Sequence, residues 1–324
     1  MTIHDYNNHY NITSDIILQK MAGYDTNNDI KRLYKLLDEL VGKVTAHYKD
    51  QITSIVLFGS ATTSEWVRGK SDIDCIVLVK DKTHTKEIEQ FLYDTLLELD
   101  KKYNLKLSDT CTSYKKTQNH MLNMILQAEK FSMFGRPFYV LSEDRIDITN
   151  ARITAIDDFK IYVGTHVLAS LNLFFHRIKS TGKILYGKDI TKEFPTKIPN
   201  LEKFKASLNA LLLLMMSFVI FPIDYRFAFQ HAVKANFWAC DNSLFALEKP
   251  LSNTESEIKE IEKIFSNSDT EYILDVNHLH QSMQYKRRKD IGNLSKLFIF
   301  KYILKTTKFV MILYIMTLQK MFSS

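Results

Sequence analysis

Four residues near the start of the chain combine types and spacing that suit phosphate and metal chemistry. Gly59 and Ser60 end one apolar segment, and Asp72 and Asp74 open another after eleven intervening residues. Side chains alternate faces along a strand, so both carboxylates are expected on the same face of the second strand. Two neighbouring carboxylates repel unless a cation lies between them. Mg²⁺ prefers oxygen ligands and keeps positions for water or phosphate oxygens, so the spacing predicts a magnesium site here.

Gly59 and Ser60 predict a phosphate-binding corner next to that metal site. Glycine has no side chain, so backbone N–H groups at Gly59 can approach an anion, and the Ser60 hydroxyl adds a donor at the expected start of a helix. A strand that ends in Gly-Ser beside a strand that begins Asp-x-Asp would hold a nucleoside triphosphate (NTP) and its metal side by side. The expected chemistry is nucleotidyl transfer, with the metal at the phosphates.

The segments around these residues predict a small sheet with helices. Apolar residues recur at helical spacing over 29–47 and again over 85–102. Short apolar runs rich in β-branched residues predict strands at Ile52–Phe58 and Ile73–Val79, and we expect a third strand at Asn104–Cys111. The polar segment 61–71 has room for two helical turns. Leu105, Leu107 and Asp109 share one face of the third predicted strand, which brings another carboxylate toward the site.

Helical periods dominate the rest of the chain. They are expected over 116–134, 152–179, 201–221, 226–248, 254–265 and from about 293 onward. One strand-like exception, Pro137–Leu141, is expected to close the sheet or to begin a linker, which places a domain boundary near residue 150. Ala210–Phe221 is almost wholly apolar but too short to span a bilayer before Pro222, so it is expected to be a buried bundle helix.

Composition excludes several classes of protein. Nine Gly and five Pro in 324 residues argue against a Gly-rich dinucleotide loop and against an all-β architecture. The three cysteines, Cys75, Cys111 and Cys240, are widely spaced and show no metal-ligand pattern. With no signal-peptide pattern at the N-terminus, they favour a cytoplasmic location.

The basic charge is concentrated at the C-terminus. Residues 285–324 hold nine Lys or Arg and one Asp, within a net charge of +6 for the chain. In the last predicted helix Lys301, Lys305 and Lys308 form a narrow stripe among apolar residues. Three interpretations are open for this helix: it packs on the bundle with its lysines exposed, it contacts RNA, or it lies as a peripheral helix on an anionic membrane surface.

The motif Leu57–Ser60 followed by Ser71–Val79, which reads LFGS and SDIDCIVLV, resembles the nucleotidyltransferase superfamily that includes DNA polymerase β and the aminoglycoside nucleotidyltransferases. The segment Gly182–Asp189, which contains Leu-Tyr-Gly, is similar to the start of the helical domain in aminoglycoside adenylyltransferases. The loop 61–70 departs from the Arg-rich, Gly-containing turn that is common in this family. The resemblance covers about two thirds of the chain.

The pattern of elements and the resemblance together predict an α+β fold, with a small mixed β-sheet nucleotidyltransferase domain (1–150) and an all-α helical-bundle domain that binds the acceptor (151–290). A basic, apolar C-terminal helix (291–324) follows, and residues beyond about 250 have no counterpart in the resemblance. The resemblance also implies two Mg²⁺ ions. Asp72 and Asp74 would ligate the ion on the triphosphate and share the second with Asp109, which would take the acceptor's proton. Gly59 and Ser60 would contact the nucleotide, with ATP or another NTP as the substrate.

The acceptor stays open at the level of sequence. A small molecule such as an aminoglycoside is favoured by the Leu-Tyr-Gly segment, and acidic residues of the helical domain would then recognise it. The basic tail favours tRNA or a protein hydroxyl, as in toxin-type nucleotidyltransferases. A module that senses nucleotide without catalysis is a third possibility, which intact Asp72 and Asp74 disfavour.

Overall fold

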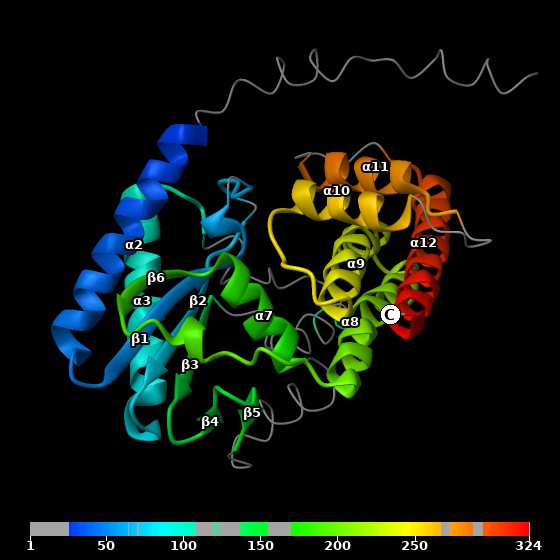
Figure 1. The fold of residues 1–324 in the computed structure, drawn as a ribbon. Coiled ribbons are helices and arrows are strands. Elements are labelled where there is room, and N and C mark those ends of the chain that lie inside the picture. The colour runs from blue at the N-terminus through cyan, green and yellow to red at the C-terminus, as the bar shows by residue number, and fades with distance from the viewer. Residues whose placement is uncertain are drawn as a thin grey trace, which may run out of the picture.

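In the computed structural model the protein is an α+β chain with a small mixed sheet and a helical bundle (Figure 1). The structure describes residues 26–63, 65–69, 71–107, 120, 123, 137–154, 170–266, 273–287 and 294–323. The N-terminal elements are α2 (Thr26–Tyr48), β1 (Ile52–Phe58), β2 (Asp74–Val79), α3 (Thr85–Tyr103), β3 (Phe138–Ser142), β4 (Ile146–Asp147) and β5 (Arg152–Ile153). They are followed by α7 (Leu171–Thr181), β6 (Lys183–Gly187), α8 (Asn200–Ile220), α9 (Tyr225–Ala246), α10 (Thr254–Phe265), α11 (Val276–Arg287) and α12 (Lys296–Ser323).

The sheet has the strand order β3-β2-β1-β6. β1 pairs antiparallel with β2 and with β6, while β2 pairs parallel with β3, so the sheet is mixed. The apolar side chains of β1 and β2 face both sides, as expected for a sheet covered on both faces. One face packs on α2 and α3 through residues such as Leu36 and Leu96, and the other packs on α7 through Phe175 and Ile178.

The structure of residues 104–107 contradicts the third strand that the sequence predicted at Asn104–Cys111. Asn104 and Lys106 have φ values of 53° and 62°, a left-handed conformation that an extended strand does not allow. Leu105 and Leu107 are nevertheless buried in the core under α2 and α3, and the Asp100 carboxylate accepts the Leu107 N–H at 2.9 Å. The strand beside β2 is β3, which contains most of the strand-like segment at 137–141.

Three further expectations need correction. The loop after Ser60 holds one 3₁₀ turn, Gly59–Thr62, in place of two helical turns. The helix expected at 152–179 begins as the short strand β5, and only its end is described as a helix, α7. The Leu-Tyr-Gly segment is the edge strand β6, so the sheet continues past the boundary expected near residue 150. Most of the helix expected at 116–134 lies outside the described residues.

The helices from α8 onward form one bundle with a shared core. α9 begins at Asp224, whose carboxylate accepts the N–H groups of Arg226 and Phe227, and it lies at the centre of the bundle in contact with α8, α10, α11 and α12. α12 contributes buried residues such as Ile303 and Phe309 to the same core. The predicted packing of the C-terminal helix on the bundle is therefore confirmed, and α11 is a helix that the periodicity alone did not indicate.

Candidate active site

Asp72 and Asp74 lie at the end of the sheet where β1 runs into its 3₁₀ turn. Phe58 is paired with Asp74 in the β1–β2 register, so Gly59 follows directly beside the Asp74 carboxylate. Ile73 and Cys75 are buried in the core under α2 and α3, which leaves Asp74 on the opposite face of β2. The predicted alternation is therefore confirmed for Ile73, Asp74 and Cys75, whereas Asp72 precedes β2 and its predicted place on the same face stays a prediction.

Gly59 makes room for Asp74. Gly59 has a φ of +73°, and a Cβ placed on it would lie 2.7 Å from Oδ2 of Asp74. Any other residue would be strained in this conformation and would also press against the carboxylate. The glycine therefore fixes both the turn out of β1 and the position of the acid next to it.

The electrostatic environment of Asp74 is that of a half-buried acid beside a second acid. Burial, with a contribution from the Asp72 carboxylate, raises the pKa of Asp74 well above its usual value. Arg177 of α7 and Lys234 of α9 oppose that rise because their positive charges favour the ionised form. A cation bound between Asp72 and Asp74 would relieve the repulsion that remains.

The two carboxylates suit Mg²⁺ as part of its ligand set. Asp72 is exposed and Asp74 half-buried, so oxygen ligands are offered at an open edge of the sheet where triphosphate oxygens could complete the coordination. Within the described residues no group of three or more His, Cys, Asp or Glu could hold a metal. Asp109, the predicted third carboxylate, lies outside the described residues, so its place in the site stays a prediction.

The loop after Ser60 is held by contacts to its own backbone and to the helical bundle. Trp66 is buried, and its indole N–H donates to the Asp72 carbonyl at 3.2 Å. The Glu65 carboxylate accepts a hydrogen bond from Thr254 at 2.8 Å and lies 3.6 Å from the Lys286 ammonium. The loop that differs from the family pattern is therefore tied to α10 and α11.

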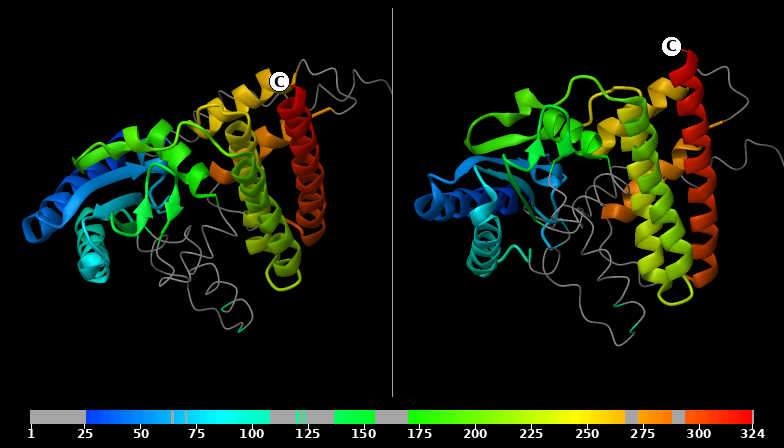
Figure 2. Two further views of the ribbon diagram at one scale, coloured as in Figure 1. Left: turned by 60° about the horizontal axis from the view of Figure 1, so that its bottom comes forward. Right: turned by 90° about the horizontal axis from the view of Figure 1, so that it is seen from below.

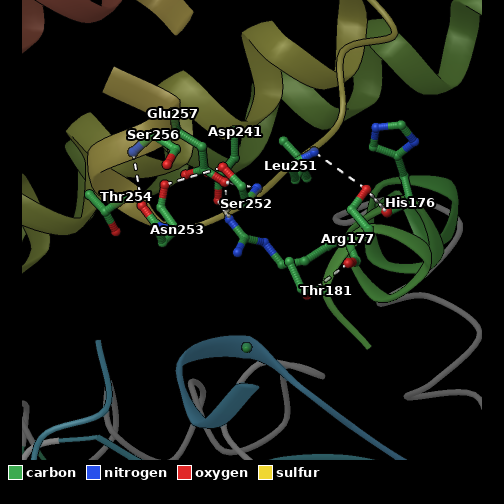
Figure 3. Close-up of polar contacts among 12 residues, drawn as sticks. His176, Arg177, Thr181, Asp241, Leu251, Ser252, Asn253, Thr254, Ser256 and Glu257 are labelled. Atoms are coloured by element: carbon green, nitrogen blue, oxygen red, sulfur yellow. Dashed lines mark hydrogen bonds and ion pairs between the residues drawn. The ribbon is translucent and has the colours of Figure 1, made fainter. Parts of the chain in front are cut away.

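A buried ion cluster, which we define as Arg177, Asp241 and Glu257, lies on the helical side of the site (Figure 3). Nη2 of Arg177 lies 2.6 Å from Oδ2 of Asp241 and 3.3 Å from Oε1 of Glu257. Glu257 also accepts the Ser252 N–H at 2.9 Å. These side chains come from α7, α9 and α10, so the cluster joins three helices on the side of the sheet that Asp74 faces.

Burial and charge act in opposite directions on this cluster. Burial would lower the pKa of Arg177, but Asp241 and Glu257 outweigh it and raise that pKa above its usual value. Burial, together with the nearby Asp241 carboxylate, raises the pKa of Glu257 well above the ordinary carboxyl range. Sequence patterns did not indicate the cluster, because its members belong to separate helices and match no motif.

One comparison with known proteins, a family model, agrees with the motif. A family model described as a nucleotidyltransferase domain matches residues 37–131, a segment that contains Gly59, Ser60, Asp72 and Asp74. No curated protein matches the sequence. Among solved structures, the chain is similar to the spectinomycin adenyltransferase AAD(9) from Enterococcus faecialis, crystallised with ATP and spectinomycin. That likeness has 11% sequence identity and a TM-score of 0.48, and covers 86% of this chain and 98% of that one. Residues 37–131 thus match a nucleotidyltransferase domain.

Proposed function

We propose that the protein transfers a nucleoside monophosphate, AMP in the first instance, from an NTP to a hydroxyl acceptor. The observation that carries the proposal is that Asp74 lies beside Gly59 and near the charge of Asp72, at the point where β1 runs into the 3₁₀ turn Gly59–Thr62. Gly59 and Ser60 would contact the phosphates through backbone N–H groups and a hydroxyl.

Asp72 and Asp74 would hold Mg²⁺ on the triphosphate. When bound, the metal would supply positive charge that stabilises the attacking and leaving oxygens. A second ion would require the third carboxylate, for which Asp109 remains our candidate. In that position Asp109 would accept the proton of the acceptor hydroxyl, provided that it comes within hydrogen-bond reach of it.

Two cations of the helical region, Arg177 and Lys234, would face the same triphosphate. Both act on the charge of Asp74, which supports their placement near the phosphates. Arg177 uses Nη2 for its contacts with Asp241 and Glu257, so Nε and Nη1 of the guanidinium can donate to phosphate oxygens. These side chains were absent from the site that the sequence predicted.

For the acceptor we favour a small hydroxyl compound that carries amino groups, such as an aminoglycoside. The support is the excess of carboxylates in the ion cluster, where Asp241 and Glu257 share the single cation Arg177. Transfer to tRNA or to a protein hydroxyl is the alternative outcome. The exposed lysines of α12 favour it, and moderate salt would then weaken acceptor turnover strongly.

Label transfer from α-labelled NTPs tests the proposal. Wild-type protein with Mg²⁺ is incubated with metabolite, RNA and protein fractions, and the labelled product and released pyrophosphate are measured. Asp74→Asn is expected to abolish both signals, while Asp144→Asn, an exposed acid in the turn after β3, leaves them unchanged. Equal label transfer by wild type and Asp74→Asn would contradict the role of Asp74 in catalysis, and no label transfer by wild-type protein to any fraction would leave nucleotide sensing as the function.

A further inference from the structure

An exposed apolar face runs along two helices on the far side of the bundle. α8 and α12 both pack on α9 and contact each other, and they run antiparallel (Figure 2). The rings of Phe221, at the end of α8, and Phe300, near the start of α12, are 5.4 Å apart. Because both helices pack on α9, their exposed sides turn away from it. We call this surface the α8/α12 face.

The α8/α12 face carries large side chains at regular helical spacing. On α8 the exposed members are Leu201, Phe204, Met215, Phe218 and Val219, and on α12 they are Leu297, Phe300, Leu304, Met311, Leu318 and Phe322. Met215 is 54% exposed and Met311 is 48% exposed. Isolated exposed apolar residues are common on soluble proteins, but a contiguous set over two neighbouring helices marks an interaction surface.

The two helices that carry this face have mostly positive charges. α8 and α12 together contain seven Lys and one acidic residue, Glu202. Lys305 lies 3.0 Å from the Asp275 carboxylate, and Lys205 lies 2.7 Å from Glu202. Lys301 and Lys308 are exposed and make no ion pair within the described part of the chain. These two lysines alternate along α12 with Phe300, Leu304 and Met311.

We propose that the α8/α12 face binds the surface of an anionic lipid bilayer. Lysines interleaved with Phe, Leu and Met suit the boundary between lipid headgroups and acyl chains, where the apolar side chains are buried and the ammonium groups reach the phosphates. A second copy of this chain would bring lysines against lysines without carboxylates to pair them. A nucleic acid would pair the lysines but leave the apolar side chains in water.

The packing of α8 indicates that the protein lies on the membrane and does not cross it. Among the described residues, α8 is the one helix that length and composition would allow to span a membrane, which by itself is weak support because core helices pass the same test. α8 buries Ala210, Leu214 and Ile220 in the bundle core, so crossing the bilayer would require that side to leave the core.

Co-sedimentation of the full-length chain with vesicles tests this proposal. The probes are vesicles of phosphatidylcholine alone and of phosphatidylcholine mixed with phosphatidylglycerol. We expect binding to the anionic vesicles only. Because each lysine near an anionic surface is worth about 1 kcal/mol, Lys301→Gln with Lys308→Gln is expected to lower the partition coefficient roughly thirtyfold.

Two further double variants complete the test. Leu304→Gln with Met311→Gln removes apolar contacts and is expected to reduce binding at least about tenfold, as estimated from the transfer free energy of two large side chains. Lys259→Gln with Lys263→Gln removes the same charge from exposed positions on α10 and is expected to bind like wild type. Circular dichroism and a thermal melt confirm that every variant is folded.

Several results would overturn the proposal. Wild-type protein that stays in the supernatant with anionic vesicles refutes it, as does an equal loss of binding in the α12 and α10 lysine variants. A concentration-dependent dimer in light scattering that Leu304→Gln with Met311→Gln dissociates, without lipid binding by wild type, would assign the face to a second copy. Vesicle binding does not depend on nucleotidyl transfer, so this test is independent of the proposed activity.

Discussion

Replacement of Arg177 by methionine is expected to destabilise the fold strongly, because it leaves the Asp241 carboxylate without its cation and Glu257 without its donor. The side chains of Arg177, Asp241 and Glu257 are 26%, 15% and 4% exposed, so little solvent is available to screen an uncompensated charge. Removal of one partner from a buried ion pair typically costs about 3–5 kcal/mol. Since Arg177 keeps about a quarter of its surface exposed, we expect a value near the lower end, about 3 kcal/mol.

Thermal and urea unfolding measure this loss. A cost of about 3 kcal/mol corresponds to a fall in Tm of roughly 4–5 °C for a protein of this size. The matched control is Arg32→Met, because Arg32 has a single carboxylate partner, Asp29, at 3.8 Å and keeps 42% of its own side chain exposed. Exposed pairs of this kind contribute about 0–1 kcal/mol, so the Tm of the control should change little.

A triple variant separates the charge effect from lost packing. When Asp241→Asn and Glu257→Gln accompany Arg177→Met, no buried charge remains, and most of the lost stability is expected to return. If Arg177→Met lowers Tm no more than Arg32→Met, or if the triple variant is less stable than the single one, the assignment of Arg177 as the cation that offsets two buried acids is wrong.

Three other perturbations have defined expected outcomes. Glu257→Gln should be neutral relative to wild type near pH 4 and increasingly stabilising toward pH 7. The pKa of Glu257 is raised in the folded protein, so the contribution of Glu257 to stability is complete below its unfolded pKa of 4.5 and is lost as the pH rises through its folded pKa. Parallel pH profiles of unfolding free energy for wild type and Glu257→Gln would contradict this. Gly59→Ala should abolish label transfer and lower the free energy of unfolding by about 1–2 kcal/mol, because alanine is strained at the positive φ of Gly59. Gly42→Ala, in open space on α2, should instead raise the free energy of unfolding by about 0.5–1 kcal/mol. Label transfer and Tm are measured for both variants, and an active Gly59→Ala would refute the crowding of Asp74. Gly187→Ala should destabilise more than either, because its Cβ would meet the Thr53 carbonyl on β1, and a melt like that of wild type would show that the edge strand can shift.

The sequence by itself determined the local parts of the site. Strand alternation placed Asp74 on one face of β2 and Ile73 on the other, since that pattern depends only on backbone geometry. The Gly-Ser and Asp-x-Asp motifs predicted the nucleotidyltransferase domain that the family model matches at residues 37–131. Helical periodicity likewise predicted α2, α3, α8, α9 and α10 close to their observed bounds.

Hydrophobic periodicity did not predict the left-handed residues or the edge strand of the sheet. The apolar alternation at 104–107 predicted a strand, but Asn104 and Lys106 adopt positive φ values that hydrophobic patterning does not encode. The edge strand β6 was expected to begin a helical domain. Its pairing with β1 depends on where α7 returns the chain to the sheet, which is a matter of packing.

Only the tertiary structure decided which charges surround Asp74. Arg177 is separated by 64 residues from Asp241 and by 80 from Glu257, and no spacing rule links positions so far apart on three helices. Their approach follows from the way α7 packs between the sheet and α9, which buries the guanidinium and forces it to find carboxylate partners there. The sequence therefore determined the groups that would act on phosphate, and the packing of the helices determined the electrostatic field in which they lie.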